Sequence, residues 1–305
     1  MRWQHVVLGV LVMAIWGFNF VVLKVALVGV PPLLLTAVRF ILSCLPVLFL
    51  ARPKGMSWRV LLIVGLTSFL GQYVFLFVAM AKGMPAGLSS VTLQLQVFVT
   101  ILLSIVLLGE RPKLKQYVGG AVAFAGLATI AATVGQGSSI PVIAMVFIVL
   151  SACIWAFGNF TMKQAGPHAG FGTLAGICWA SLVPPIPALA LSLAFEGPER
   201  IFAALAHIQP LTLAAVAYTV VLSTWVGFAV WGRLISSYPA GTAAPFALLV
   251  PVFGGLSSYL VLGETLTSTR LVGSALIFLG LAIILLPWDR LMGAKAKGPV
   301  SQPAL

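Results

Sequence analysis

The sequence predicts an all-α membrane protein with ten transmembrane helices, arranged as two inverted five-helix repeats. Two observations lead to this fold class. Of the 305 residues, 61% are hydrophobic and 7% are charged, too few polar residues to cover the surface of a soluble domain of this size. The second half of the sequence also repeats the first half in a constant register. Lipid is therefore the expected solvent.

Division of the chain at its charged residues, glycines and prolines gives ten apolar segments. A helix needs about 20 apolar residues to cross a hydrocarbon core about 30 Å thick. The segments are close to this length, so each is expected to cross the bilayer once. The expected spans are 6–26, 31–50, 59–81, 87–108, 115–133, 141–163, 171–194, 211–235, 240–262 and 269–287.

The basic residues predict the orientation of these spans. Most of the 17 Lys and Arg residues fall on one set of span ends: Arg2, Arg52, Lys54, Arg59, Arg111, Lys113, Lys115, Lys163, Arg233, Arg290, Lys295 and Lys297. The opposite set has only Lys24, Lys82, Arg200 and Arg270. Cytoplasmic loops carry the excess of Lys and Arg, so both termini are expected in the cytoplasm.

An internal repeat links the two halves of the chain. Pro85-Ala86-Gly87 recurs 154 positions later as Pro239-Ala240-Gly241, and Leu108-Gly109-Glu110 recurs at the same offset as Leu262-Gly263-Glu264. Nearer the N-terminus, Ile15-Trp16 and Lys24 match Ile154-Trp155 and Lys163 at an offset of 139. The difference predicts an insertion in the second half, in the loop around 196–210.

The repeat predicts a five-span unit that was duplicated. The expected units are residues 1–137 and 138–288, followed by a cytoplasmic tail at 289–305. An odd number of spans makes the second unit enter the membrane from the opposite side. Inverted repeats are common in secondary transporters, because a site between the repeats can open alternately to either side. This favours transport of a small polar metabolite.

The few acidic residues limit the mechanism. Glu110 and Glu264 are expected at span ends, Glu196 and Glu199 in an outer loop, and Asp289 beyond the last span. Carboxylates inside the membrane are the usual proton relays and cation sites of pumps. Facilitated diffusion, or coupling through an unusual group, is therefore expected. The two repeat-equivalent glutamates either gate opposite faces or form ordinary pairs with basic residues at span ends.

The polar residues inside the spans are mainly amides, and each must bond a neighbouring helix or face an aqueous cavity. With Trp16, Tyr73, Trp155, Trp179 and Trp225 they can form a neutral, aromatic-walled cavity that suits a zwitterionic solute. For each tryptophan alone, lipid contact or packing is the alternative. The candidate substrate-binding residues are Trp16, Asn19, Arg39, Gln72, Gln94, Gln96, Trp155 and Asn159.

Three further features of the spans allow more than one interpretation. Arg39 stands inside a span, where it can meet a substrate carboxylate, bond helix carbonyls or extend its side chain to the surface. Prolines in spans 171–194 and 240–262 interrupt helical hydrogen bonding near a binding site or simply kink the helix for packing. Glycines in spans 115–133 and 269–287 permit close helix contact, within one chain or between two, so a monomer or a homodimer is compatible with the sequence.

Other classes of protein are disfavoured. The three cysteines, Cys44, Cys153 and Cys178, lie in apolar stretches without metal-ligand spacing, so no metal site and no cofactor are expected. No His pair, acidic cluster or GxSxG motif within the spans indicates an enzyme. The basic excess forms no stripe interleaved with aromatic residues, which disfavours nucleic acid as a partner. A non-transporting membrane sensor or scaffold remains an alternative.

Several segments resemble the EamA family of the drug/metabolite transporter superfamily. These are Ile-Trp-Gly-Phe-Asn-Phe-Val-Val-Leu-Lys at 15–24, Arg39-Phe40, Gly83-Met84-Pro85-Ala86-Gly87 with Leu93-Gln94-Leu95-Gln96, Leu-Gly-Glu at 108–110, and Leu248-Leu249-Val250-Pro251-Val252. Within the family, the chain is most similar to the bacterial O-acetylserine/cysteine exporter type. The resemblance implies a multi-pass protein of the bacterial inner membrane that exports amino acids or related metabolites. It also implies a central cavity lined mainly by the first, third, fourth, sixth, eighth and ninth spans. Export of drugs or other metabolites is the alternative within the same fold.

Overall fold

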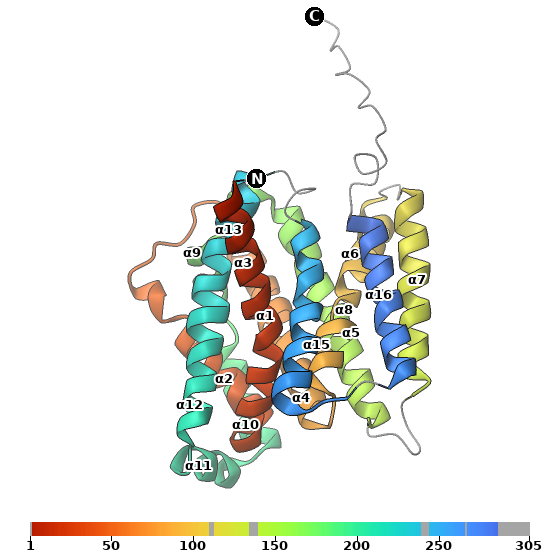
Figure 1. Ribbon diagram of the computed structural model, residues 1–305. Coiled ribbons are helices and arrows are strands. Elements are labelled where there is room, and N and C mark those ends of the chain that lie inside the picture. Colours follow the sequence, from red (N-terminus) through yellow and green to blue (C-terminus); the bar gives the residue numbers. More distant parts are fainter. Residues whose placement is uncertain (1, 110–112, 134–139, 239–243, 266, 286–305) are drawn as a thin grey trace, which may run out of the picture.

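The computed structural model describes residues 2–109, 113–133, 140–238, 244–265 and 267–285 (Figure 1). Within these ranges every regular element is a helix. The helices of the first half are α1 (Trp3–Gly29), α2 (Pro32–Ser43), η1 (Leu45–Leu48), α3 (Trp58–Val64), η2 (Gly65–Gly71), α4 (Gln72–Ala81), α5 (Ala86–Thr92), α6 (Leu95–Leu108) and α7 (Leu114–Ala131).

The second half repeats this order with one additional helix. Its elements are α8 (Val142–Ala165), η3 (Pro167–Ala169), α9 (Leu174–Ala180), α10 (Pro185–Phe195), α11 (Pro198–Ala206), α12 (Pro210–Ala217), η4 (Tyr218–Val226), α13 (Gly227–Ser237), η5 (Ala244–Leu248), α15 (Leu249–Leu262) and α16 (Ser268–Leu285). Helix α11 occupies the insertion that the sequence predicted as a loop, so that prediction was wrong over 198–206. Pro198 begins α11 with its fixed φ and Glu199 lies in its first turn, both favourable at a helix start.

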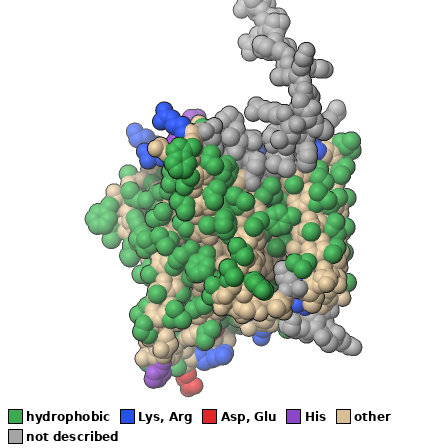
Figure 2. Space-filling view, viewed as in Figure 1, with side chains coloured by type: hydrophobic (Ala, Val, Ile, Leu, Met, Phe, Trp, Pro, Cys, Tyr) green, Lys and Arg blue, Asp and Glu red, His purple; other side chains and the backbone are tan. Residues whose placement is uncertain are grey.

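The outer surface of the bundle is suited to lipid. Side chains such as Ile186 and Phe195 are 81% and 77% exposed, which water would disfavour. Figure 2 shows hydrophobic side chains over most of the visible face, and the basic (blue) and acidic (red) side chains lie mainly toward its two ends. Seven described helical segments have the length and composition to cross a membrane: 3–29, 58–81, 86–107, 114–131, 142–165, 174–195 and 210–234. Shorter apolar helices lie at Pro32–Leu48, Phe246–Leu262 and Ser268–Ile284.

The two halves pack against each other in reciprocal pairs. Helix α1 contacts α12, η4 and α15, and its counterpart α8 contacts α4, η2 and α6. Three further contacts join counterparts directly, because α2 packs on α10, α5 on α15 and α7 on α16. Figure 1 shows α1 beside α15 and α7 beside α16, with the start of α1 and the end of α16 at the same end of the bundle. Helices α1 and α8 therefore lie at the centre of the contacts between the halves.

Glycines bring α7 and α16 into close contact, as the small-residue faces of these spans predicted. A methyl group added at Gly119 would lie 2.6 Å from the carbonyl oxygen of Gly280, and one added at Gly126 would lie 2.5 Å from that of Gly273. Backbones can approach this closely only where no side chain intervenes. The close contact is thus formed within one chain.

Several spans are interrupted within the bundle. The fourth is divided between α5 and α6 at Leu93 and Gln94, and the ninth changes from the 3-10 helix η5 to α15 at Leu248 and Leu249. These breaks occupy equivalent positions of the repeat. The third and eighth spans contain the π-helical segments η2 and η4, again at equivalent places. Prolines indicated the break in the ninth span, but no proline marks the break in the fourth.

Candidate functional site

The interrupted fourth and ninth spans meet inside the bundle. Nε2 of Gln94, at the break between α5 and α6, donates to the carbonyl oxygen of Ala247 in η5 at 3.3 Å. Helix breaks leave backbone carbonyl groups without their helical partners, and these groups must be satisfied within the protein. Gln94 is buried and satisfies one of them across the boundary between the two halves. Discontinuous helices of this kind form the substrate sites of many secondary transporters.

A second polar centre surrounds Arg39 of α2, whose side chain is 1% exposed. Its Nη2 donates to the Tyr73 hydroxyl of α4 at 3.1 Å and to Thr224 Oγ1 of η4 at 3.4 Å. The guanidinium carbon also lies 4.1 Å from the centre of the Tyr73 ring, a cation–π contact. Of the three possibilities that the sequence left open for Arg39, extension to the surface is therefore wrong.

Arg39 retains unused hydrogen-bond donors. Neither Nε nor Nη1 has a partner among the described residues, although both are buried. Three carboxylates are described, and the recorded bonds of Glu196 and Glu264 go to other groups, while Glu199 is exposed on α11. The described part of the protein thus leaves a buried cation without an acidic partner.

Two of the predicted amides form a pair across the two halves. Nδ2 of Asn159, on α8, donates to Oε1 of Gln96, on α6, at 2.6 Å. Thr100 is one turn further along α6, and its hydroxyl bonds the Gln96 carbonyl at 2.6 Å and approaches that of Ala156 at 3.4 Å. The sequence predicted both amides, and the tertiary structure brings them together.

The remaining predicted amides lie on central helices without bonding each other. Asn19 of α1 is buried, and its Oδ1 has no partner among the described residues. Gln72, at the start of α4, is also buried, and its backbone carbonyl accepts from the Ser151 hydroxyl of α8 at 2.7 Å. Asn19 therefore offers a free acceptor, whereas the recorded bond of Gln72 contributes to helix packing.

The predicted tryptophans mostly join helices. Nε1 of Trp16 donates to the carbonyl of Ser223 in η4 at 2.9 Å, and its ring packs against Phe228. Trp225 similarly donates to the carbonyl of Ser43 at 3.1 Å, which links η4 to the end of α2. Trp155 is half-buried and packs against the main hydrophobic core. These rings form walls between helices.

Trp179 lies apart from the other aromatic residues of the predicted wall. Its Nε1 donates to the carbonyl of Leu50 at 2.8 Å, and its ring meets Trp58 edge-on. These contacts fix α9 to the connection between η1 and α3. The prediction that Trp179 belongs to the wall of a central cavity is not supported by these contacts.

Two of the three described glutamates, both in the second half of the chain, bind helix N-termini of the first half. Glu196 accepts from the backbone N–H groups of Leu33 and Leu34 at 2.7 and 3.0 Å, and Glu264 from those of Ala86 and Gly87 at 2.8 and 3.0 Å. Glu196 is buried and lies in the turn between α10 and α11, as predicted, but it is enclosed by the protein. The recorded bonds of Glu264 are to backbone N–H groups, which neither interpretation of this glutamate anticipated. Its repeat equivalent Glu110 lies outside the described residues, as does Asp289.

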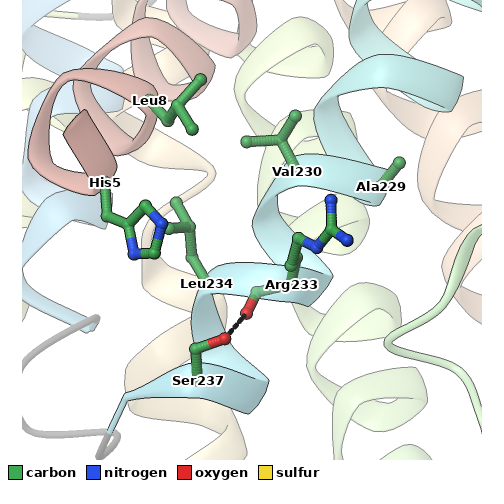
Figure 3. A pocket seen from close by; sticks show the side chains of 7 residues that line it. All are labelled: His5, Leu8, Ala229, Val230, Arg233, Leu234 and Ser237. Carbon is green, nitrogen blue, oxygen red and sulfur yellow. Dashed lines mark hydrogen bonds between the residues drawn. The ribbon is translucent and has the colours of Figure 1, made fainter. Parts of the chain in front are cut away.

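A separate cavity of about 170 Å³ lies at one end of the bundle, between the start of α1 and the end of α13. Figure 3 shows it lined by His5, Leu8, Ala229, Val230, Arg233, Leu234 and Ser237. None of the eight predicted substrate-binding residues lines it. The polar centre around Arg39 and the interrupted spans is therefore distinct from this cavity.

Sequence reasoning missed Thr224 and Ser223, which supply two contacts to the predicted residues. A single Thr or Ser in an apolar span is common, because its hydroxyl can bond the carbonyl one turn earlier. Thr224 instead bonds the Thr219 carbonyl five residues earlier, in the π-helical geometry of η4. The internal repeat gives no signal for either residue, because their equivalents at the offset of 154 are the apolar Phe69 and Leu70.

A multi-pass helical bundle with interrupted spans and a polar centre between two similar halves is the architecture of a membrane transporter. The chain belongs to the EamA-like transporter family, whose sequence model matches twice, at residues 3–132 and 142–286. The resemblance inferred from the sequence is thereby confirmed. The matches cover most of the chain.

Relatives agree with this assignment. A "Probable amino-acid metabolite efflux pump" of Salmonella typhimurium is 39% identical over 278 residues, covering 90% of this chain and 93% of the relative. A protein of the same name from Escherichia coli is 38% identical, covering 91% and 93%. A "Probable terminal-alkyne amino-acid exporter" of Streptantibioticus cattleyicolor is 25% identical over 76% of this chain and 75% of that one. A crystal structure 19% identical in sequence shares the fold, with a TM-score of 0.61 over 95% of this chain and 99% of that one.

Proposed function

We propose that the protein exports amino acids or close derivatives, such as O-acetylserine and cysteine, by alternating access. The chain would cross the bacterial inner membrane ten times as two inverted five-helix repeats, 1–137 and 138–288, with the tail 289–305 and both termini in the cytoplasm. It would act as a monomer or a homodimer. The names of the Salmonella and Escherichia relatives support the substrate class.

One observation carries the mechanism. Two helix breaks stand at equivalent positions of the repeat and are joined by the bond from Gln94 to Ala247. A site between two similar halves can open to one face and then to the other when the halves rock. The proposed substrate contacts are Trp16, Asn19, Arg39, Gln72, Gln94, Gln96, Trp155 and Asn159.

Efflux from proteoliposomes tests this function. The purified protein is reconstituted, and release of labelled cysteine, O-acetylserine and aromatic amino acids is measured with and without a pH gradient. Flux of the cysteine-pathway solutes above protein-free vesicles is the expected result. Flux without a pH gradient identifies a facilitator. This is the expected outcome, because no described carboxylate is placed as a proton relay. Flux of none of these solutes contradicts the proposal and favours export of other compounds or a non-transporting sensor.

A further inference from the structure

Arg39 is a buried cation whose charge is not balanced by any described residue. Its side chain is 1% exposed, and Nε and Nη1 have no hydrogen-bond partner in the part of the chain that the structure describes. A buried guanidinium is costly unless it is paired and hydrogen-bonded. The rings of Tyr73 and Phe40 offset part of this cost, at 4.1 and 5.7 Å from the guanidinium carbon. A ligand that supplies an anion would offset more.

The described glutamates are committed elsewhere. Glu196 and Glu264 each accept two backbone N–H groups at a helix start, and Glu199 is exposed on α11. Each of these carboxylates therefore already has a helix end or water as its environment. An anion for Arg39 then has to come from outside this part of the chain.

The groups around Arg39 suit a carboxylate. Nε and Nη1 carry three N–H bonds between them, and guanidinium binds carboxylate through such donors. The Tyr73 hydroxyl accepts from Nη2, and its own hydrogen has no recorded acceptor, so it can donate to the same anion. Thr224 gives its hydrogen to the Thr219 carbonyl and can only accept from Arg39, so it fixes the guanidinium without competing for the anion.

The position of this centre matches what transport requires. Arg39 and Tyr73 come from the first half, and Thr224 from the second, so the centre lies across the boundary that would open and close. Tyr73 follows the π-helical segment η2, and Thr224 lies within η4. Short π-helical segments inside helices are frequent at functional sites.

An unpaired acceptor lies on a neighbouring helix. Oδ1 of Asn19 is buried without a partner among the described residues, on α1, which contacts both α2 and η4. Asn19 precedes the end of α1 by ten residues, and Arg39 follows the start of α2 by seven. At 1.5 Å per residue these are about 15 and about 10 Å from the same end of the bundle. The free N–H groups of Arg39 and the free Oδ1 of Asn19 therefore lie at similar depth. They match the carboxylate and the ammonium group of an amino acid.

We propose that Arg39 and the Tyr73 hydroxyl bind the carboxylate of a zwitterionic substrate, and that Asn19 Oδ1 accepts from its ammonium group. This rests on the proposed function and narrows its substrates to molecules that carry both groups. Arg39 is covered in this structure, so the substrate reaches it when α2, α4 and η4 separate. An Arg39 that served only packing would discriminate no such groups.

Competition in proteoliposomes tests the inference. Efflux of labelled cysteine is inhibited with unlabelled cysteine, with cysteinamide, which lacks the carboxylate, and with 3-mercaptopropionate, which lacks the ammonium. For the unaltered protein, each analogue is expected to compete at least tenfold more weakly than cysteine. Arg39→Gln is expected to raise the KM for cysteine at least tenfold and to remove the preference over cysteinamide. Asn19→Leu is expected to remove only the preference over 3-mercaptopropionate.

Two more variants separate recognition from folding. Tyr73→Phe keeps the ring beside Arg39 and removes the hydroxyl, so the preference for cysteine over cysteinamide should fall severalfold. This variant tests the inference even if Arg39→Gln fails to insert into the membrane. Arg52→Gln removes a different arginine, bonded to the Met56 carbonyl, and should change neither preference. The inference is overturned if Tyr73→Phe, or an Arg39→Gln that inserts normally, keeps its preference for cysteine over cysteinamide. In that case, efflux by the unaltered protein still supports the proposed function. Absence of efflux of cysteine, O-acetylserine and the aromatic amino acids alike overturns both.

Discussion

The amides of Gln96 and Asn159 are the best-defined polar pair among the predicted residues. Their 2.6 Å hydrogen bond joins α6 to α8 inside the bundle. An amide in hydrocarbon that loses its partner must find another or remain unpaired. The pair therefore contributes to the contact between the two halves as well as to a polar interior.

Replacement of this pair is expected to show coupling between its members. Asn159→Leu and Gln96→Leu should each lower stability in detergent, and the double variant should lose about 0.6 kcal/mol less than the sum, the average for hydrogen bonds between membrane helices. A double-mutant cycle from thermal or denaturant unfolding measures this. Strict additivity would show that the bond contributes nothing.

A second prediction concerns the amide at the helix breaks. Gln94→Leu removes the donor to the Ala247 carbonyl, which is left at the interruption of the ninth span. We expect cysteine efflux to fall at least tenfold while membrane insertion is retained, because the side chain has similar size. Efflux rate per inserted protein is the measurement. Normal efflux would assign Gln94 to packing.

At the scale of elements, carboxylates of the second half fix helix starts of the first half. Glu264 accepts from two N–H groups at the start of α5, and Lys24 donates to the Met80 carbonyl at 2.8 Å near the end of α4. A carboxylate satisfies free N–H groups and favours the positive end of the helix dipole. The connection between α4 and α5 is thus bound by Lys24 near the end of α4 and by Glu264 at the start of α5.

Removal of this cap is expected to destabilise the protein. Glu264→Ala should cost about 0.5–2 kcal/mol, the usual cost of losing an N-terminal cap, and Glu264→Gln less because one acceptor remains. Thermal unfolding in detergent measures the loss. Glu199→Ala is the matched control, since Glu199 is exposed in the first turn of α11. Equal effects of the two alanine variants would contradict the capping role.

At the scale of the whole molecule, the contact between α7 and α16 fixes one side of the bundle. It depends on glycines whose added methyl group would overlap the facing backbone. Interlocking backbones tolerate little added volume, because overpacking shifts the helices themselves.

Alanine substitutions on one helix test this contact. Gly126→Ala places a methyl 2.5 Å from the Gly273 carbonyl oxygen, whereas Gly120→Ala, on the same helix, meets its nearest neighbour, in Phe98, at 4.0 Å. We expect Gly126→Ala to cost about 1–3 kcal/mol. Gly120→Ala should be neutral or stabilising by up to about 1 kcal/mol, because alanine favours the helix. Unfolding of the two variants in detergent gives the comparison, and equal stability would refute the close contact.

The sequence by itself determined the helical membrane class, the duplication and the polar residues of the interior. Hydropathy and repeat register are properties of consecutive residues, so they can be read without tertiary contacts. The pairing of Asn159 with Gln96 and the enclosure of Arg39 by Tyr73 and Thr224 join residues 63, 34 and 185 positions apart. Only the tertiary structure decided these contacts, because they depend on how the apolar helices rotate and pack. The helix α11 and the carboxylate caps were likewise decided there, since helix ends in a folded bundle take whichever acceptors packing brings to them.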